Sequence, residues 1–482
     1  MRQLAMIRLL AIITGGITFL MIPSLVTAVI LQETPMIRAF LIPVLCGFLV
    51  ALAAILISPK LPFTFRIRDG FLLVFLTWVL ASLAGSIPYL LSLQNIHFSD
   101  AIFESSCSFT TTGATTFSNV ELMPRSILLW RSMSHWAGGM GIILLTVALM
   151  PLLGVGGFQL IKAEVPGPEK EKISPRITST AKILWGVYCI FTLTLILLYR
   201  IGGMQWFDAV CHGFTIITTG GVSTKNAGLA FYDSAFIDWV SVLFMLLGAL
   251  NFIMYYRIVR GKYKDLLNNT ESRVYIGIFF IAALGISICL IPQYDAIGDA
   301  LRIGFFQAAS FLSSTGHART DYTVWPPLAQ AILFCLLFVG GCSGSTAGGI
   351  KVVRHTVLFK QAMNELRRLI YPQGVFSIQL NKKQGRKDVV YGVAGFVFLY
   401  FIVVTLTAFI TAAAGFDIFE SINTALSITG NFGSGFSAAG PNYNFNAYPY
   451  HLKLFYSLVM IAGRLELWTV FILFTPKYWK MW

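Results

Sequence analysis

The fold is decided by the stretch DAIFESSCSFTTTGAT, residues 100–115, because it follows an apolar segment and recurs with variations three more times. Each copy is of intermediate polarity, opens near an Asp and closes on Thr, Ser or Asn followed by Gly. The other copies are DAVCHGFTIITTGGV (208–222), DALRIGFFQAASFLSSTGH (299–317) and DIFESINTALSITGNFGSG (417–435). An internal repeat on this scale indicates the architecture more strongly than any single motif does.

The composition around these copies indicates an integral membrane protein. Of the 482 residues, 56% are hydrophobic and 12% are charged, about half the roughly 25% of charged residues that is usual in soluble domains. Apolar stretches close to 20 residues long match the hydrocarbon thickness of a bilayer, which excludes a soluble enzyme and a disordered chain. The predicted spans are residues 5–30, 38–58, 70–92, 126–153, 182–202, 235–257, 273–293, 327–350, 388–414 and 452–475.

The basic residues predict the orientation of these spans. The net charge is +14, but Lys and Arg are spread over short loops and form no continuous face, so nucleic acid is not expected as a partner. By the positive-inside rule the more basic side is cytoplasmic, which places both termini inside the cell. All but nine of the 35 basic residues lie on that side; the nine are Arg38, Arg125, Arg131, Arg200, Lys225, Arg302, Arg319, Lys453 and Arg464.

Each repeated stretch predicts a segment that enters the membrane and returns. Aligning Gly113, Gly220, Gly316 and Gly433 leaves intervals of 107, 96 and 117 residues, which suit two spans and one such segment. The helical part of the first copy is about 18 Å long, roughly half the bilayer. The predicted fold is an all-α polytopic membrane protein with four span, pore-loop, span repeats around one pseudo-fourfold pore and two extra N-terminal helices. The predicted units are residues 1–68, 69–160, 161–260, 261–387 and 388–482.

The returning strands predict a selectivity filter. Backbone carbonyls at membrane depth are costly unless protein encloses them or they face an ion path. A ring of them replaces the hydration shell of an alkali cation, and the C-terminal ends of the half-helices add a favourable negative potential. For any single copy, Thr-Thr-Gly could instead merely cap a helix. The predicted filter residues are Thr111, Thr112, Gly113, Thr218, Thr219, Gly220, Ser314, Thr315, Gly316, Asn431, Phe432 and Gly433.

This pattern resembles the Trk/Ktr/HKT superfamily of potassium transporters over essentially the whole chain. The stretches SHWAGGMGI (134–142), AEVPGPEKEKISPRI (163–177), GGCSGSTAGGIK (340–351) and AGRLELW (462–468) resemble the Trk-type membrane subunit in particular. The resemblance implies K⁺ as the permeating ion, no cofactor bound by this chain and a bacterial inner-membrane location. It also implies a homodimer and a cytoplasmic nucleotide-binding ring of the RCK type, similar to TrkA, as regulator.

The filter strands depart from related patterns in two ways. No strand carries the TVGYG of tetrameric potassium channels, and the residues after the aligned glycines differ between copies. Plant relatives that favour Na⁺ are similar but have Ser at the first filter glycine, so Gly113 favours K⁺, with a Na⁺-permeable relative as the alternative.

A run of small residues predicts a gate beneath the filter. Residues 340–349 contain no large side chain, although the apolar segment around them extends from 327 to about 370. Each interior Gly costs a helix about 1 kcal/mol, and Ser and Thr can bond local backbone groups instead. Close helix packing by small residues is the alternative. The predicted gate residues are Gly344, Ser345, Thr346, Ala347, Gly348, Gly349 and Arg464.

Arg464 lies in the last predicted span, where a charge needs a partner or an aqueous cavity. Its partner could be Glu466 or a distant carbonyl, and the residue could be either a barrier to cations or a structural salt bridge behind the pore. His135 and His212 are interpreted as packing residues, because neither has metal-ligand partners at a suitable spacing. The glycine runs do not have P-loop spacing, so nucleotide control has to come from another chain.

The basic segment 351–387 follows the predicted gate. A helix over 350–371 would be about 30 Å long, long enough for a cytoplasmic ring to pull on the gate, although anionic lipid also attracts such a segment. An ion-coupled secondary transporter, using protons or Na⁺, is the alternative function; such proteins use buried carboxylates, and here most acids lie at span ends. An intramembrane enzyme is disfavoured, since no catalytic set of side chains lies at matched depth.

Overall fold

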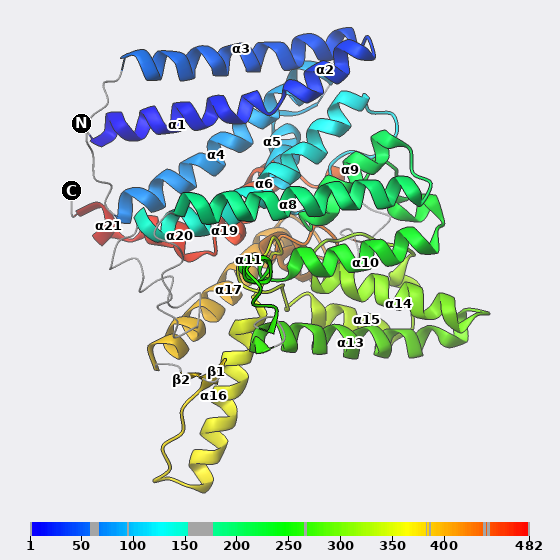
Figure 1. Ribbon diagram of the computed structural model, residues 1–482, viewed down its shortest axis with the longest axis vertical. Coiled ribbons are helices and arrows are strands. Elements are labelled where there is room, and N and C mark those ends of the chain that lie inside the picture. The colour runs from blue at the N-terminus through cyan, green and yellow to red at the C-terminus, as the bar shows by residue number, and fades with distance from the viewer. Residues whose placement is uncertain are drawn as a thin grey trace.

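The computed structural model describes residues 2–57, 67–93, 96–152, 177–264, 268–381, 383–384, 387–436, 440 and 444–480. The regular secondary structure of the described residues is helical apart from one short hairpin (Figure 1). The motif at 163–177 lies outside the described residues except for Ile177. The helices of the described residues confirm the predicted all-α class.

Three helices precede the repeats. They are α1 (Arg2–Phe19), α2 (Ile22–Ile30) and α3 (Thr34–Ile57). Pro23 lies in the first turn of α2, where proline is tolerated but cannot continue the preceding helix, so the predicted first span is divided there. Helices α1 and α3 pack against each other and against α4, with α1 and α3 along one edge of the bundle (Figure 1).

The rest of the chain repeats one unit four times. The opening helices are α4 (Ile67–Ser92), α8 (Ile177–Ile201), α13 (Thr270–Leu290) and α17 (Lys387–Ala413). The short pore helices are α5 (Phe98–Phe109), α9 (Trp206–Ile217), α14 (Ile297–Leu312) and α18 (Ile418–Thr429). The closing elements are α6 (Arg125–Leu152), α10 with α11 (Ala235–Ala249, Phe252–Val259), α15 with α16 (Pro327–Leu336, Val352–Ile370) and α19 with α20 (Tyr450–Arg464, Trp468–Phe471).

Six helices among the described residues are long and apolar enough to cross a membrane, and eight if each of two bent pairs counts as one span. These eight correspond to eight of the ten predicted spans. The other two predicted spans fall on α6 and on α15 with the non-helical residues that follow it. The chain is therefore a multi-pass membrane protein.

The four units close into a ring. Helix α6 of the first unit packs on pore helix α9 of the second, and α10 of the second packs on α14 of the third. The third meets the fourth where Phe334 of α15 stacks on Phe419 of α18, with ring centroids 6.2 Å apart. Helix α19 of the fourth returns to α5 of the first. Each pore helix is thus held by its own unit and by a neighbouring one.

Three of the four closing helices are broken, whereas the sequence predicted a break only in the third. Helices α10 and α11 meet at 93° and α19 and the segment after it at 111°. Asn251 caps α11 by accepting a hydrogen bond from the Ile253 N–H at 2.8 Å, and Glu466 and Leu467 have positive φ angles. Neither break contains Gly or Pro, the usual sequence markers of a helix end.

Helix α16 projects from the bundle (Figure 1), in agreement with the helix predicted over 350–371. The chain returns through the hairpin of β1 (Gln379–Leu380) and β2 (Lys383–Gln384). Ile378 and Leu380 are buried against Val357 of α16 and Val393 of α17. The remaining elements are η1 (Gly228–Tyr232), η2 (Ile291–Gln293), η3 (Tyr322–Val324), η5 (Phe445–Ala447), η6 (Ile472–Phe474) and α21 (Pro476–Lys480).

Candidate selectivity filter and gate

All four pore helices end in the same way. Each has a C-cap residue in the right-handed region, and the next residue has a positive φ of 52° to 54°. The residue after that donates its N–H to the carbonyl five positions back, as Thr112 does to Cys107 O at 2.9 Å. This is the Schellman arrangement. The positive-φ residues are Thr111, Thr219, Ser314 and Asn431, so three of the four positions that usually hold Gly or Asn hold Thr or Ser.

These helix ends correct the predicted alignment of the second repeat by one residue. The bond equivalent to that of Thr112 is made by Gly220, whose N–H donates to Thr215 O at 2.8 Å. The glycine after it, Gly221, has a φ of 69°, in line with 89° at Gly113, 81° at Gly316 and 72° at Gly433. The triplet of the second repeat that corresponds to 111–113 is therefore Thr219, Gly220 and Gly221, and Thr218 is the C-cap of α9.

The realigned glycines lie where each strand meets the next. A Cβ on Gly113 would overlap Gly220 O, one on Gly221 would overlap Thr315 O, one on Gly316 would overlap Phe432 O, and one on Gly433 would overlap Thr112 O. The contacts run from the first repeat through the fourth and back to the first. Gly220, by contrast, faces His135 of α6. The four strands thus encircle one axis, and only glycine fits at these four positions.

The carbonyls of these strands have no partner within the described protein. No backbone oxygen of residues 111–113, 219–221, 314–316 or 431–433 accepts a hydrogen bond from another described residue. Thr112, Thr315 and Phe432 are at most 1% exposed. Buried carbonyls are normally hydrogen-bonded. The carbonyls of these strands therefore suit a bound species that carries positive charge but no N–H groups, and a dehydrated cation is such a species.

In three repeats, the residue nine positions before the aligned glycine has a polar side chain. This side chain forms hydrogen bonds with the residues that follow that glycine. Glu104 accepts hydrogen bonds from Thr115 Oγ1 at 2.7 Å and from the N–H and hydroxyl of Thr116. His212 shares a hydrogen bond of 2.9 Å with Ser223 Oγ, and Gln307 bonds His317 O and the Arg319 N–H. The sequence did not indicate this function, because the common offset of nine residues appears only when Gly221 is aligned with Gly113.

Glu104 also forms a buried ion pair. Its Oε2 lies 3.2 Å from Arg131 Nε, and the two side chains are 1% and 3% exposed. We expect Arg131→Ala to destabilise the protein by about 3–5 kcal/mol, because removal of one partner leaves the other charge buried and uncompensated. The loss is measured as a lower melting temperature in detergent. Arg125→Ala, at the start of the same helix, is the matched control, and equal melting temperatures for the two variants would contradict the expectation.

The predicted gate residues 344–349 lie in a non-helical loop that contacts the strand after the third pore helix. Its neck is closed by Gly340 N–H to Ile350 O at 2.9 Å and by Val352 N–H to Gly341 O at 3.1 Å. At the top of the loop, the Gly348 N–H donates to Ser314 Oγ at 2.6 Å. Thr346 Oγ1 donates to Gly248 O at 2.9 Å. The loop therefore contacts the third filter strand and the break between α10 and α11.

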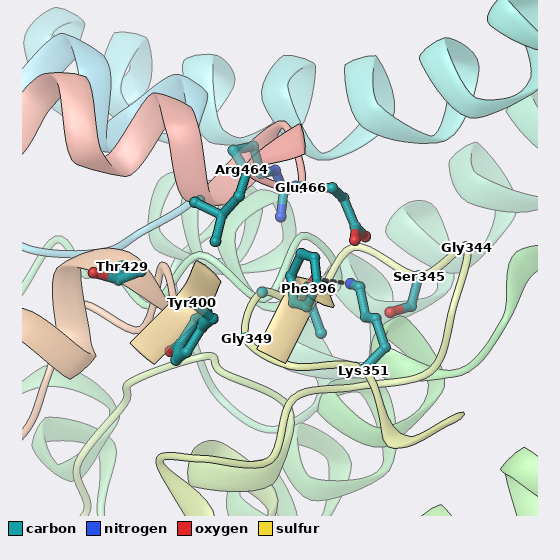
Figure 2. A pocket seen from close by; sticks show the side chains of 13 residues that line it. Gly344, Ser345, Gly349, Lys351, Phe396, Tyr400, Thr429, Arg464 and Glu466 are labelled. Carbon is teal, nitrogen blue, oxygen red and sulfur yellow. Dashed lines mark hydrogen bonds between the residues drawn. The ribbon is translucent and has the colours of Figure 1, made fainter. Parts of the chain in front are cut away.

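Arg464 is bonded to this loop. It is the last residue of α19, is 4% exposed, and its Nη1 donates to Thr346 O at 2.6 Å. Of the two partners considered from the sequence, the distant carbonyl is the one found. Figure 2 shows Arg464, Lys351 and Glu466 around one cavity with Gly344 and Gly349 of the loop.

Glu466 pairs with another residue, Arg354 of α16. The guanidinium of Arg354 also lies 3.6 Å from the centroid of the Phe396 ring of α17. The ion pair therefore joins the break after α19 to α16, the helix that follows the loop. Lys351, Arg354 and Arg464 outnumber Glu466 in this cluster, so its formal charge is positive.

His135 packs as predicted: its Nδ1 lies 2.9 Å from Arg131 O and its ring lies against Gly220. His212 is buried as predicted, and it also holds Ser223 as described above. Asp238 is buried too, but it pairs with Arg319 at 3.0 Å and with Arg302 at 3.7 Å. The buried carboxylates Glu104 and Asp238 are thus engaged by arginines.

A ring of re-entrant strands with unpartnered carbonyls, enclosed by membrane-spanning helices, defines a cation pathway. Residues 44–481 match the TrkH family, described as cation transport proteins, and the chain belongs to that family. It is 35% identical to the Trk system potassium uptake protein TrkH of Halomonas elongata over 98% of each chain. It is 36% identical to the protein of the same name from Escherichia coli over 86% of each chain.

A solved structure is similar throughout. The crystal structure of the potassium transporter TrkH from Vibrio parahaemolyticus superposes with a TM-score of 0.89 at 31% sequence identity. The match covers 99% of this chain and 100% of the other. The resemblance stated from the sequence is confirmed.

Proposed function

We propose that this chain takes up K⁺ across the bacterial inner membrane through a gated, channel-like pore. The observation that carries the proposal is the closed ring of four strands whose buried carbonyls accept no hydrogen bond from described residues. The ion binds where Thr112, Gly220, Thr315 and Phe432 bring their oxygens against the glycines of the neighbouring strands. The relatives named as potassium uptake proteins support K⁺ as the ion.

The loop and Arg464 act as the gate in this proposal. The loop lies under the filter, and Arg464 donates to its Thr346 carbonyl. A guanidinium beside the path opposes a cation by about 4 kcal/mol at contact distance with an effective dielectric near 20. The loop is held by a few hydrogen bonds and contains no regular helix, so it can move without unfolding a span.

The proposal is tested on the purified protein in planar bilayers with K⁺ on one side and Na⁺ on the other. We expect discrete single-channel steps and a reversal potential that favours K⁺. Flux without unitary steps that depends on a proton or Na⁺ gradient would favour the ion-coupled transporter instead. A reversal potential near zero would indicate a Na⁺-permeable relative.

A cytoplasmic nucleotide-binding ring is the proposed regulator, and a homodimer is the proposed assembly. Helix α16 supports a docking role because it projects from the bundle, is joined to the loop and ends in the exposed Arg367 and Arg368 (Figure 1). The proposal also places the start of α1 and the end of α21 inside the cell, as the positive-inside rule predicts.

Reversing the charge of both Arg367 and Arg368 is expected to weaken ring binding at least about tenfold and to abolish nucleotide control of flux, while the open pore still conducts. The reason is that charge pairs at an interface contribute to both affinity and register. Binding is measured with the purified ring, and flux with Rb⁺. The exposed pair Arg260 and Lys262, reversed together, is the control. Normal control by nucleotide in both anionic and neutral lipid would exclude docking at this segment.

A further inference from the structure

The gate loop is held at its neck by a residue outside the loop, Glu271. This residue lies in the first turn of α13 and is 8% exposed. Its Oε1 accepts a hydrogen bond from the Ser343 N–H at 2.6 Å and another from the Val353 N–H at 3.3 Å. Ser343 lies at the start of the loop, next to the predicted gate residues, and Val353 is the second residue of α16. One carboxylate oxygen therefore joins the two ends of the loop.

The neighbouring residue connects Glu271 to the cytoplasmic hairpin. The Thr270 N–H donates to Asn381 Oδ1 at 2.8 Å, and the Asn381 N–H donates to Thr270 Oγ1 at 3.1 Å. Asn381 follows β1 and has a φ of 49°. Lys360 of α16 donates to Gln379 O of β1 at 2.6 Å. The hairpin thus contacts both α16 and the start of α13.

We propose that Glu271 is the positioning residue that keeps the gate loop closed, and that the hairpin turn at Asn381 determines the position of Glu271. A displacement of the hairpin would move Thr270 and withdraw the carboxylate from the Ser343 and Val353 N–H groups. The neck would then open without any change in the filter. This inference rests on the proposed function of the loop as a gate, and it adds a route to the gate that does not run along α16.

The physical reason is the strength and placement of these bonds. Hydrogen bonds to a charged acceptor contribute more than neutral ones, and a buried N–H that loses its acceptor is costly. With both bonds present, the ends of the loop are fixed relative to α13. Without them, the two sides of the neck are still joined by the backbone bonds between 340–341 and 350–352, but neither side is bonded to α13 through Glu271.

Cys342 provides a direct readout of the loop. It is buried and free, and its N–H donates to Ala249 O at 2.8 Å. Its rate of modification by a maleimide, followed by peptide mass spectrometry, reports how often the loop leaves its site. Basal Rb⁺ flux into proteoliposomes without the regulatory partner is measured on the same preparations.

We expect Glu271→Ala to accelerate the modification of Cys342 about tenfold and to raise basal flux several-fold, in keeping with the loss of two charge-assisted bonds. Glu271→Gln keeps an acceptor oxygen and should restore much of the wild-type behaviour. Asn381→Ala should give an intermediate acceleration, and it serves as the second variant if Glu271→Ala does not fold.

Glu33 offers a matched control. Its carboxylate also accepts two backbone N–H groups, those of Arg125 at 3.0 Å and Ser126 at 3.3 Å, but at the start of α6. Glu33→Ala should lower the melting temperature without changing the rate at Cys342. One outcome is that Glu271→Ala and Asn381→Ala leave the rate of Cys342 modification and the flux at wild-type values while Arg464→Ala raises the flux. In that case the positioning role of Glu271 is wrong, and the proposal that the loop is a gate still holds. If none of these variants raises the flux, the loop is not a gate and both proposals fail.

Discussion

Replacing Gly221 with Ser is expected to reduce the preference for K⁺ over Na⁺ by about tenfold or more, which corresponds to about 1.4 kcal/mol of discrimination. Gly221 has a φ of 69°, and a Cβ there would overlap the carbonyl of Thr315 in the next strand. The side chain therefore forces that oxygen out of the ring, and selectivity by carbonyl rings depends on the number and geometry of the oxygens. Gly113→Ser should have the same effect.

The measurement is the reversal potential in mixed K⁺ and Na⁺. Gly186→Ser is the control, because a Cβ at Gly186 of α8 meets no atom within 4 Å. A normal reversal potential for Gly221→Ser would contradict the alignment of Gly221 with Gly113 and would favour the alignment of Gly220 with Gly113. A normal potential for Gly113→Ser as well would exclude these strands as the filter.

Removing the gate is expected to give the second large effect. Deleting residues 344–348, or replacing Arg464 with Ala, should raise basal Rb⁺ flux at least about tenfold in the absence of the regulatory partner, since each change removes a barrier beneath the filter. Arg464 contributes its charge and its bond to Thr346 O, whereas the deletion removes the loop itself.

Arg200→Ala serves as the control, because Arg200 also donates to a backbone carbonyl, Met204 O at 3.2 Å, but lies at the end of α8. Flux equal to that of the wild type in both gate variants, with normal folding, would assign the loop and Arg464 a structural function only.

The sequence predicted the repeats and the interruption of the third closing helix at 340–349 because both depend on local chemistry. Four polar stretches between apolar spans, and ten small residues in a row, admit few other arrangements in a membrane. The alignment of the second repeat was wrong by one residue, because Gly220 and Gly221 are adjacent and either could be the filter glycine. Only the contact of Gly221 with the third strand distinguishes them.

The breaks in α10 and α19 could not be predicted in the same way. They occur at Asn251 and at Glu466–Leu467, where the local sequence permits a helix. The backbone there is turned by contacts made across the molecule, such as the pairing of Glu466 with Arg354 over 112 positions of sequence. The bond of Arg464 to Thr346 O and the bonds of Glu271 to the Ser343 and Val353 N–H groups are also contacts between residues far apart in the sequence.

The most direct test of the account is the position of a bound heavy cation in crystals grown with Rb⁺ or Tl⁺. We expect anomalous density on the axis of the ring, between the carbonyls of Thr112, Gly220, Thr315 and Phe432, and the loss of this density in the Gly221→Ser variant. Density at another place along the pore, with this ring empty at saturating Rb⁺ or Tl⁺, would contradict it.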